Sequence, residues 1–239
     1  MTCFTGLRFG MNHCSVFLAM AYRRTENVVR RLTARHDAIL AAAREAASAG
    51  GMAAIQIAPI AARAGIAAGT VYRYFPGKSD LVGALIARLS EREIGAVRRA
   101  ADAAPGPLSA LVAAIMTFAT RALRNRRLAW AVIAEPVDAE IDRMRLKYRK
   151  ALATELESRI QAAIDGGHLP EHDAGLAAPA LVGALLEGLI GPLAPPGIED
   201  GASAREAVQM LTLIALRGLG VVDARARGLV VQSALPAGL

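Results

Sequence analysis

Two short apolar segments separated by a glycine, between residues 57 and 74, most constrain the fold of this chain. The first segment, residues 57–64, contains Pro59, which a helix tolerates only in its first turn. Gly65 then interrupts the chain, and a second short helix is expected from Ala67 or Ala68 to Tyr74. The pattern therefore predicts two helices of about two turns each, joined by a tight turn.

Helical patterns continue on both sides of this segment. A helix is predicted from Thr33 to the glycines at 50 and 51, because apolar residues recur at three- and four-residue spacing, namely Leu32, His36, Ile39, Leu40, Ala43 and Ala47. Ser79 is expected to cap a long helix to about residue 103, with Leu81, Leu85, Ile86 and Leu89 inward. Further helices are predicted near 107–124, 127–135, 138–165, 173–193 and 203–222. Since period-two runs of β-branched residues are missing, we predict an all-α fold.

Positive charge is concentrated in the N-terminal part of the chain. The first 100 residues carry 14 Lys and Arg against six Asp and Glu, whereas the rest carries 14 against 15. A basic head on a nearly neutral body suits a polyanion such as double-stranded DNA, although a merely solvated surface has the same composition.

The glycine-separated pair has the parts of a helix-turn-helix in their usual order. Ile66, Val71 and Phe75 are expected to pack inward. Thr70 and Tyr72 offer hydroxyls to phosphates, Arg73 can reach a phosphate or a guanine edge, and Lys78 can meet the flanking backbone. The full set of candidate DNA contacts is Arg44, Arg63, Ala68, Gly69, Thr70, Tyr72, Arg73, Tyr74 and Lys78.

The same segment resembles the N-terminal signature of the tetracycline-repressor (TetR/AcrR) family of transcriptional regulators. The resemblance covers about residues 33–82 and is carried by Ile60-Ala-Ala-Arg-Ala-Gly-Ile-Ala-Ala-Gly-Thr-Val-Tyr-Arg-Tyr-Phe-Pro-Gly-Lys-Ser-Asp-Leu81. It implies a three-helix DNA-binding head, a linking helix, and a C-terminal helical domain for ligand binding and dimerisation. The expected function is a ligand-responsive regulator, a repressor that binds a palindromic operator as a homodimer. The chain departs from the family at Ile55-Gln56 and Ala67, where members carry hydroxyl residues that anchor phosphate.

The resemblance and the composition divide the chain into three parts. Residues 1–24 are expected to be an extension without structure, 25–80 the DNA-binding domain, and 81–239 the effector-binding and dimerisation domain. Translation is expected to start at Met20 or Met11 rather than Met1, since the short apolar run before Ala21 only weakly resembles a signal peptide. A cytoplasmic protein without cofactor or metal is expected, because Cys3 and Cys14 both lie in this tail.

The C-terminal part contains apolar side chains that can line a cavity between helices, although each of them can equally be ordinary core. The candidate ligand-binding residues are Met116, Phe118, Trp130, Ile133, Met144, Tyr148 and Leu185, together with Leu189. They indicate an apolar or amphipathic small-molecule effector whose identity the sequence leaves open.

Two other classes of function have weaker support. Residues 176–194 contain one charge, Glu187, and reach the minimum length of a membrane span, but their glycines and prolines favour a helix buried at a dimer interface. An enzyme would need coupled buried acids, for which Glu135, Asp138 and Glu187 are the candidates. The His168-Leu-Pro-Glu-His172 run has the form of a zinc-protease motif, but Pro170 breaks the helix that this motif requires.

Overall fold

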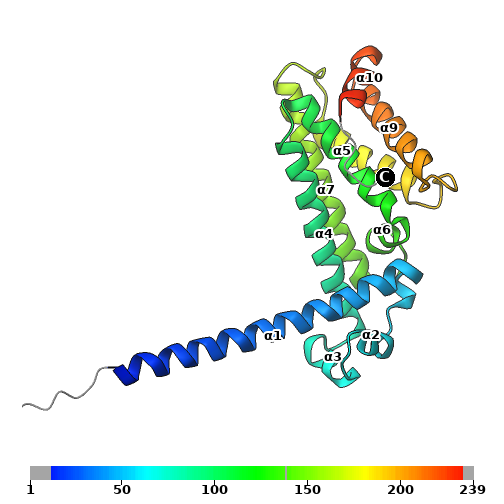
Figure 1. Ribbon diagram of the computed structural model, residues 1–239. Coiled ribbons are helices and arrows are strands. Elements are labelled where there is room, and N and C mark those ends of the chain that lie inside the picture. Colours follow the sequence, from blue (N-terminus) through cyan, green and yellow to red (C-terminus); the bar gives the residue numbers. More distant parts are fainter. Residues whose placement is uncertain (1–11, 138, 234–239) are drawn as a thin grey trace, which may run out of the picture.

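A computed structural model describes residues 12–137 and 139–233, and every regular element in these ranges is helical (Figure 1). The all-α prediction is therefore confirmed. In chain order the elements are α1 Asn12–Gly50, the 3₁₀ turn η1 Met52–Ala54, α2 Ile57–Arg63, α3 Ala68–Tyr74, α4 Lys78–Asp102, α5 Pro107–Arg124, α6 Arg126–Ile133, α7 Ala139–Asp165, α8 Ala174–Leu189, α9 Gly201–Gly218 and α10 Asp223–Gln232.

The head consists of the C-terminal half of α1 together with α2 and α3 (Figure 1). Ile39 and Ala43 of α1, Ile60 of α2 and Val71 of α3 are all buried in its small core. Gly65 between α2 and α3 has a φ of 67°, a left-handed conformation that glycine adopts without strain. The glycine-separated pair therefore forms the predicted helix-turn-helix.

Helix α4 joins the head to the body, since it packs against α1 at one end and against α5 and α7 along its length. Leu81, Leu85, Ile86 and Leu89 are buried as predicted. The start of the helix differs from the prediction, because Gly77 rather than Ser79 is the N-cap. The Asp80 carboxylate accepts a hydrogen bond from the Gly77 N–H at 2.8 Å, so an acid inside the first turn satisfies this helix end.

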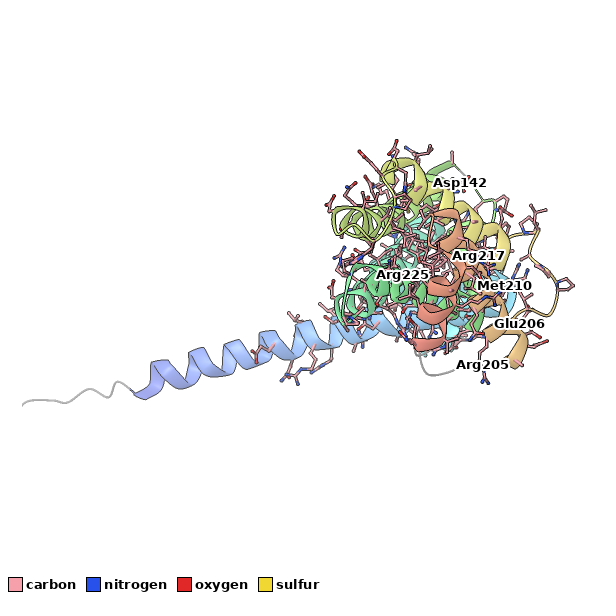
Figure 2. All side chains as sticks on the ribbon, turned by 90° about the horizontal axis from the view of Figure 1, so that it is seen from above. Asp142, Arg205, Glu206, Met210, Arg217 and Arg225 are labelled. Carbon is pink, nitrogen blue, oxygen red and sulfur yellow. The ribbon has the colours of Figure 1, made fainter. Side chains whose placement is uncertain are left out.

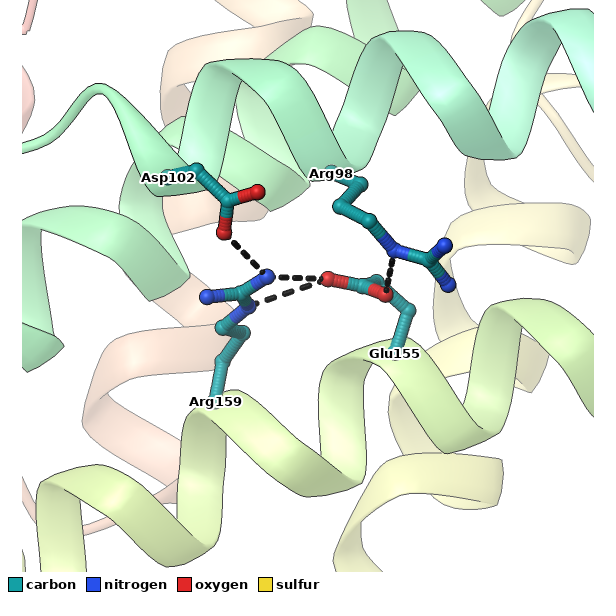
Figure 3. Close-up of polar contacts among 4 residues, drawn as sticks. All are labelled: Arg98, Asp102, Glu155 and Arg159. Atoms are coloured by element: carbon teal, nitrogen blue, oxygen red, sulfur yellow. Dashed lines mark hydrogen bonds and ion pairs between the residues drawn. The ribbon is translucent and has the colours of Figure 1, made fainter.

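In the body, α5 lies between α4, α7 and α9 and is buried along almost its whole length. Charged side chains join α4 to α7 (Figure 3). Glu155 of α7 is almost fully buried and accepts hydrogen bonds from Arg98 Nε and Arg159 Nε, each at 3.0 Å, while Arg159 Nη2 also reaches Asp102 at 2.8 Å. Such a charge-assisted network fixes the register of two long helices.

The two ends of the described chain differ from the predictions. Helix α1 begins at Asn12 and includes residues 12–24, which were expected to lack structure, while residues 1–11 lie outside the described residues. Leu32 is half exposed rather than on the packed face. The helix predicted at 203–222 is α9, which ends at Gly218, and Gly220 with a φ of 89° then turns the chain into α10, a helix that was not predicted.

The stretch at 176–194 does not form one long apolar helix. Helix α8 ends at Leu189, and the chain then turns at Gly191 and Pro192. Among the described residues, no helix combines the length and the hydropathy that crossing a bilayer requires.

Candidate DNA-binding surface and effector cavity

The outer face of α3 presents its polar side chains to solvent while its inner face holds the helix in place. Tyr72 and Arg73 are exposed, and Lys78 is exposed at the start of α4. Val71 and Phe75 are buried, as predicted, and anchor the helix from behind. The Arg73 guanidinium, the Tyr72 hydroxyl and the Lys78 ammonium group therefore project from a helix that is held in place from behind. Such groups can contact a phosphate backbone and a base edge.

The first turn of α3 is open. Ala67 is the N-cap and makes no side-chain capping bond, in line with the missing hydroxyl noted in the sequence. A Cβ added at Gly69 would meet no atom within 4 Å, so packing inside the protein does not require a glycine there. Small residues at this end leave the helix backbone accessible to a large partner.

Three of the predicted DNA contacts lie elsewhere or are engaged. The Tyr74 hydroxyl is buried without a hydrogen-bond partner, and its ring lies 6.4 Å from that of His36, so Tyr74 is part of the interior of the head. Arg44 faces the body and lines the cavity described below. Arg63 remains exposed and lies 3.7 Å from Glu45 of α1.

A cavity of about 220 Å³ lies where the head meets the body. Helices α1, α4, α5, α6 and α7 all contribute to its walls. Its lining residues are Arg44, Leu89, Arg92, Glu93, Phe118, Arg121, Ala122, Arg124, Asn125, Leu128, Ala129, Val132, Ile133 and Tyr148. Half of these residues are apolar and half are charged or polar, so the cavity combines apolar surface with polar groups that can orient a small molecule.

The polar groups of the cavity are centred on one ion pair. The Arg121 guanidinium donates two hydrogen bonds to the Glu93 carboxylate, from Nη2 at 2.8 Å and from Nε. These bonds to Glu93 raise the pKa of Arg121. The hydroxyl of Tyr148 is close to this pair, and burial of the ring, followed by the Glu93 charge, raises the pKa of the phenol. Tyr148 therefore stays protonated at neutral pH and can donate a hydrogen bond.

The structure brings together three of the predicted ligand-binding residues, Phe118, Ile133 and Tyr148, in this cavity. Met116, Leu185 and Leu189 are core residues with almost no exposed surface, whereas Trp130 and Met144 line shallower hollows elsewhere on the body. The Glu93–Arg121 pair and Arg92 are further cavity residues that were not predicted from the sequence. Residues 93 and 121 are 28 positions apart in the sequence, so no local pattern connects them.

Helix α6, which forms one wall of the cavity, is also bonded to the head. Glu135, just beyond α6, accepts a hydrogen bond from the Met52 N–H at 3.1 Å, and Arg127 donates to the Gly50 carbonyl at 3.2 Å. Gly51 lies between them with a φ of 71°, and a Cβ there would collide with both Arg127 and Glu135. Cavity and helix-turn-helix are therefore connected through directly bonded backbone.

Outside these two regions, the candidate acids and histidines do not form a catalytic or metal site. Glu135 pairs with Arg127 at 3.6 Å, Glu187 is exposed, and Asp138 lies outside the described residues. His172 Nδ1 lies 2.8 Å from the Pro170 carbonyl oxygen in a turn. No cluster of three potential metal ligands occurs in the part of the chain that the structure describes.

A helix-turn-helix that exposes basic side chains on its second helix has the geometry of a head that binds the major groove of DNA. Residues 39–85 match the family described as bacterial regulatory proteins, tetR family. The match covers the head of the chain, whose helix-turn-helix therefore resembles the DNA-binding domain of this family.

Two curated relatives match only part of the chain. The chain is 42% identical over 77 residues to the transcriptional repressor KstR of Mycolicibacterium smegmatis. The matched segment makes up 32% of this chain and 38% of that protein. It is 47% identical over 58 residues to KstR of Rhodococcus jostii, and this segment makes up 24% of this chain and 27% of that protein. The chain thus matches well under half the length of these curated relatives.

Solved structures extend the likeness to the body. The fatty acid degradation regulator FadR of Bacillus halodurans has a TM-score of 0.68 at 21% identity, over 79% of this chain and 97% of that chain. RolR in complex with resorcinol has a TM-score of 0.62 at 20% identity, and the match covers 87% of this chain and 98% of that chain. At this level of identity the likeness establishes the shared fold of head and body.

Proposed function

We propose that this protein is a transcriptional repressor that binds a palindromic DNA operator as a homodimer in the cytoplasm and releases it when a small molecule occupies the cavity. The observation that carries the proposal is the row of Tyr72, Arg73 and Lys78, exposed on a helix whose opposite face is buried. The two relatives that match part of this chain are named as transcriptional repressors, which supports the same activity here.

Within the operator complex each side chain has a distinct role. Arg73 is the candidate for a base-edge contact, Tyr72 and Lys78 for phosphates, and Thr70 for either. The open space at Gly69 lets the start of α3 approach the floor of the major groove closely. Since the small residues Ala68 and Gly69 read few bases directly, sequence-dependent DNA shape supplies part of the specificity.

A dimer is supported by the apolar surface of the last body helices. On α8, the small residues Ala180, Gly183 and Ala184 are exposed, and on α9, Met210 and Ile214 are about half exposed. Figure 2 shows Met210 on α9 together with the charged Arg205, Glu206 and Arg217 of the same helix. A two-fold dimer that covers such an apolar face would place two copies of α3 on successive major grooves, roughly 34–36 Å apart or a multiple of this.

Effector control is supported by the position of the cavity. A molecule between α1, α4 and α6 touches the linking helix and the helix bonded to Gly50 and Met52, so it can shift the head relative to the body. Solved neighbours hold small organic molecules, namely resorcinol in RolR and stearoyl-CoA in FadR of Bacillus subtilis. Linkage then requires that operator DNA weaken effector binding by the same factor.

The direct test is selection of genomic fragments by the purified full-length protein, followed by sequencing. We expect enrichment of one short palindrome, and its affinity should fall for Arg73→Ala. Arg99→Ala is the matched control, because Arg99 is an exposed arginine of α4 in the body, away from α8 and α9. Failure to enrich any palindrome, with the protein folded and dimeric, would contradict the proposed function.

A further inference from the structure

We propose that the cavity at the junction of head and body takes a small organic anion, a carboxylate carried by an apolar ring or a short apolar chain. This inference rests on the proposed function in one respect, namely that the occupant is the effector. The charge of the lining, a hydroxyl without a hydrogen-bond partner and the size of the cavity carry it, and each is independent of the others.

The charge of the lining favours an anion. Four arginines, Arg44, Arg92, Arg121 and Arg124, line the cavity with a single carboxylate, Glu93. Glu93 is already engaged by both donor nitrogens of Arg121. Within the described ranges, Arg44 and Arg92 form no ion pair with the protein. A cationic occupant would meet a net positive site, whereas a carboxylate would be bound by guanidinium groups whose planar donors match its two oxygens.

Tyr148 supplies a hydrogen-bond donor to the same space. The residue is only 4% exposed, lines the cavity, and its hydroxyl takes part in no hydrogen bond among the residues described. The hydroxyl retains some accessible surface, so a ligand or water in the cavity can reach it. Because the phenol remains protonated, it can donate to a carboxylate oxygen.

The size of the cavity limits the apolar part of the occupant. An apolar cavity of about 150 Å³ accommodates one benzene ring, and this cavity is about 220 Å³. The space therefore fits one six-membered ring or a chain of similar volume, with a short acid group attached. Leu89, Phe118 and Val132 are all buried around it and provide the apolar contact surface.

The arginines come from different helices, which links this chemistry to regulation. Arg44 belongs to α1 of the head, whereas Arg92 belongs to α4 and Arg124 to α5. An anion bound by Arg44 and Arg92 together would tie the end of α1 to the linking helix. Its charge would then hold one relative position of head and body, which an uncharged molecule of the same shape could not do.

The test compares acids with their neutral amides on the full-length protein. Phenylacetate, 3-phenylpropionate and hexanoate are titrated by calorimetry beside phenylacetamide, 3-phenylpropanamide and hexanamide, without DNA. At least one acid should bind about tenfold or more tightly than its amide. Arg44→Ala and Arg92→Ala should each weaken the acid by about tenfold and leave the amide unchanged, and Tyr148→Phe should weaken the acid by a smaller factor.

Arg99→Ala is the matched control, since Arg99 is an exposed arginine of the same helix α4 outside the cavity, and it should bind the acid like the unaltered protein. Equal binding of every acid and its amide, or no binding of any acid by a folded protein, would overturn the inference. Operator binding is measured separately on the same samples. An acid that binds to a protein without operator affinity would refute the proposed function and leave the ligand class standing.

Discussion

Two tyrosines show how differently the head and the body use the same chemistry. Tyr72, on the recognition helix α3, is 51% exposed, and its hydroxyl is available to any partner that approaches from outside. Tyr148, on α7, is 4% exposed, and its hydroxyl is available only to a molecule small enough to enter the cavity. The head can therefore contact a large partner at its surface, whereas the body can bind only a molecule that fits into its cavity.

The largest expected effect is loss of head function by a change in the body alone. Ala184→Glu places a charge on the exposed small face of α8, where a partner subunit would have to bury it. We expect monomers by analytical ultracentrifugation and an operator affinity at least about 100-fold lower, since two linked heads gain avidity that one lacks.

Ala162→Glu is the control for this change, because Ala162 is an exposed alanine of α7. Leu185 and Leu189 of α8 and Leu213 of α9 are buried within their own subunit, so charges there would damage the fold instead. Full operator affinity of an Ala184→Glu dimer would show that α8 is not the interface.

A change at Arg145 should affect the stability of the body and leave DNA recognition intact. The Arg145 side chain is fully buried, donates to the carbonyl of Ala131 at 2.6 Å and to that of Glu135, and lies 3.2 Å from Asp142. Arg145→Met removes these bonds at the end of α6 and should lower the free energy of unfolding by about 2–4 kcal/mol.

Urea unfolding measures this loss, and Arg143→Met on the exposed side of α7 serves as its control. Below the unfolding transition, the variant should bind the operator with the preference of the unaltered protein. An unchanged midpoint would mean that the buried guanidinium contributes no net stability.

Replacing each of two basic residues of the head should change DNA binding in a different way. Arg73→Ala should cost about 1–3 kcal/mol and relax the preference at one base pair of each half-site. Lys78→Ala should weaken binding to all DNA sequences alike. It should also reduce the slope of log affinity against log salt concentration by about one for each subunit. Anisotropy titrations at several salt concentrations distinguish the two, and an unchanged preference in Arg73→Ala would remove the recognition role from this residue.

The smallest effect concerns two exposed ion pairs, one at the head and one in the body. A hydrogen bond from Arg88 lowers the pKa of Asp37, and hydrogen bonds from Arg227 and then Arg217 lower that of Asp223. Because the folded-state pKa lies below the unfolded one, each pair stabilises above the unfolded-state pKa and loses this contribution as pH falls through the folded-state value.

NMR titration of the carboxyl groups should show the pKa values of Asp37 and Asp223 both below 3.8. Arg88→Ala should raise that of Asp37 and leave Asp223 unaffected. An Asp37 that titrates normally in the unaltered protein would show that solvent screens the pair completely.

The head was largely predictable because its determinants are contiguous. The turn at Gly65, the anchors Val71 and Phe75 and the exposed Arg73 all lie within one short segment whose spacing dictates which side faces inward. Tyr74, predicted to contact DNA, is half-buried with its ring near that of His36, because a tyrosine at the end of a short helix can face either way and this contact depends on how α1 crosses it.

The cavity was only partly predictable because it exists only after five helices pack. Phe118, Ile133 and Tyr148 were found by residue type, but Arg44 was assigned to DNA by its charge, although it faces the body. The Glu93–Arg121 pair has no sequence signal, since nothing in the pattern of α4 or α5 indicates which charged residues turn inward.

Asn125 has a consequence for the construction of chimeric regulators. Its side-chain oxygen caps α6 by accepting from the Leu128 N–H at 3.0 Å, and its amide nitrogen donates to the Ser48 hydroxyl of α1 at 2.9 Å. One amide therefore starts a helix of the body and attaches it to the head. A head transplanted from a relative onto this body would need a hydrogen-bond acceptor at position 48, since a mismatch there would uncouple sensing from DNA binding while both halves stayed folded.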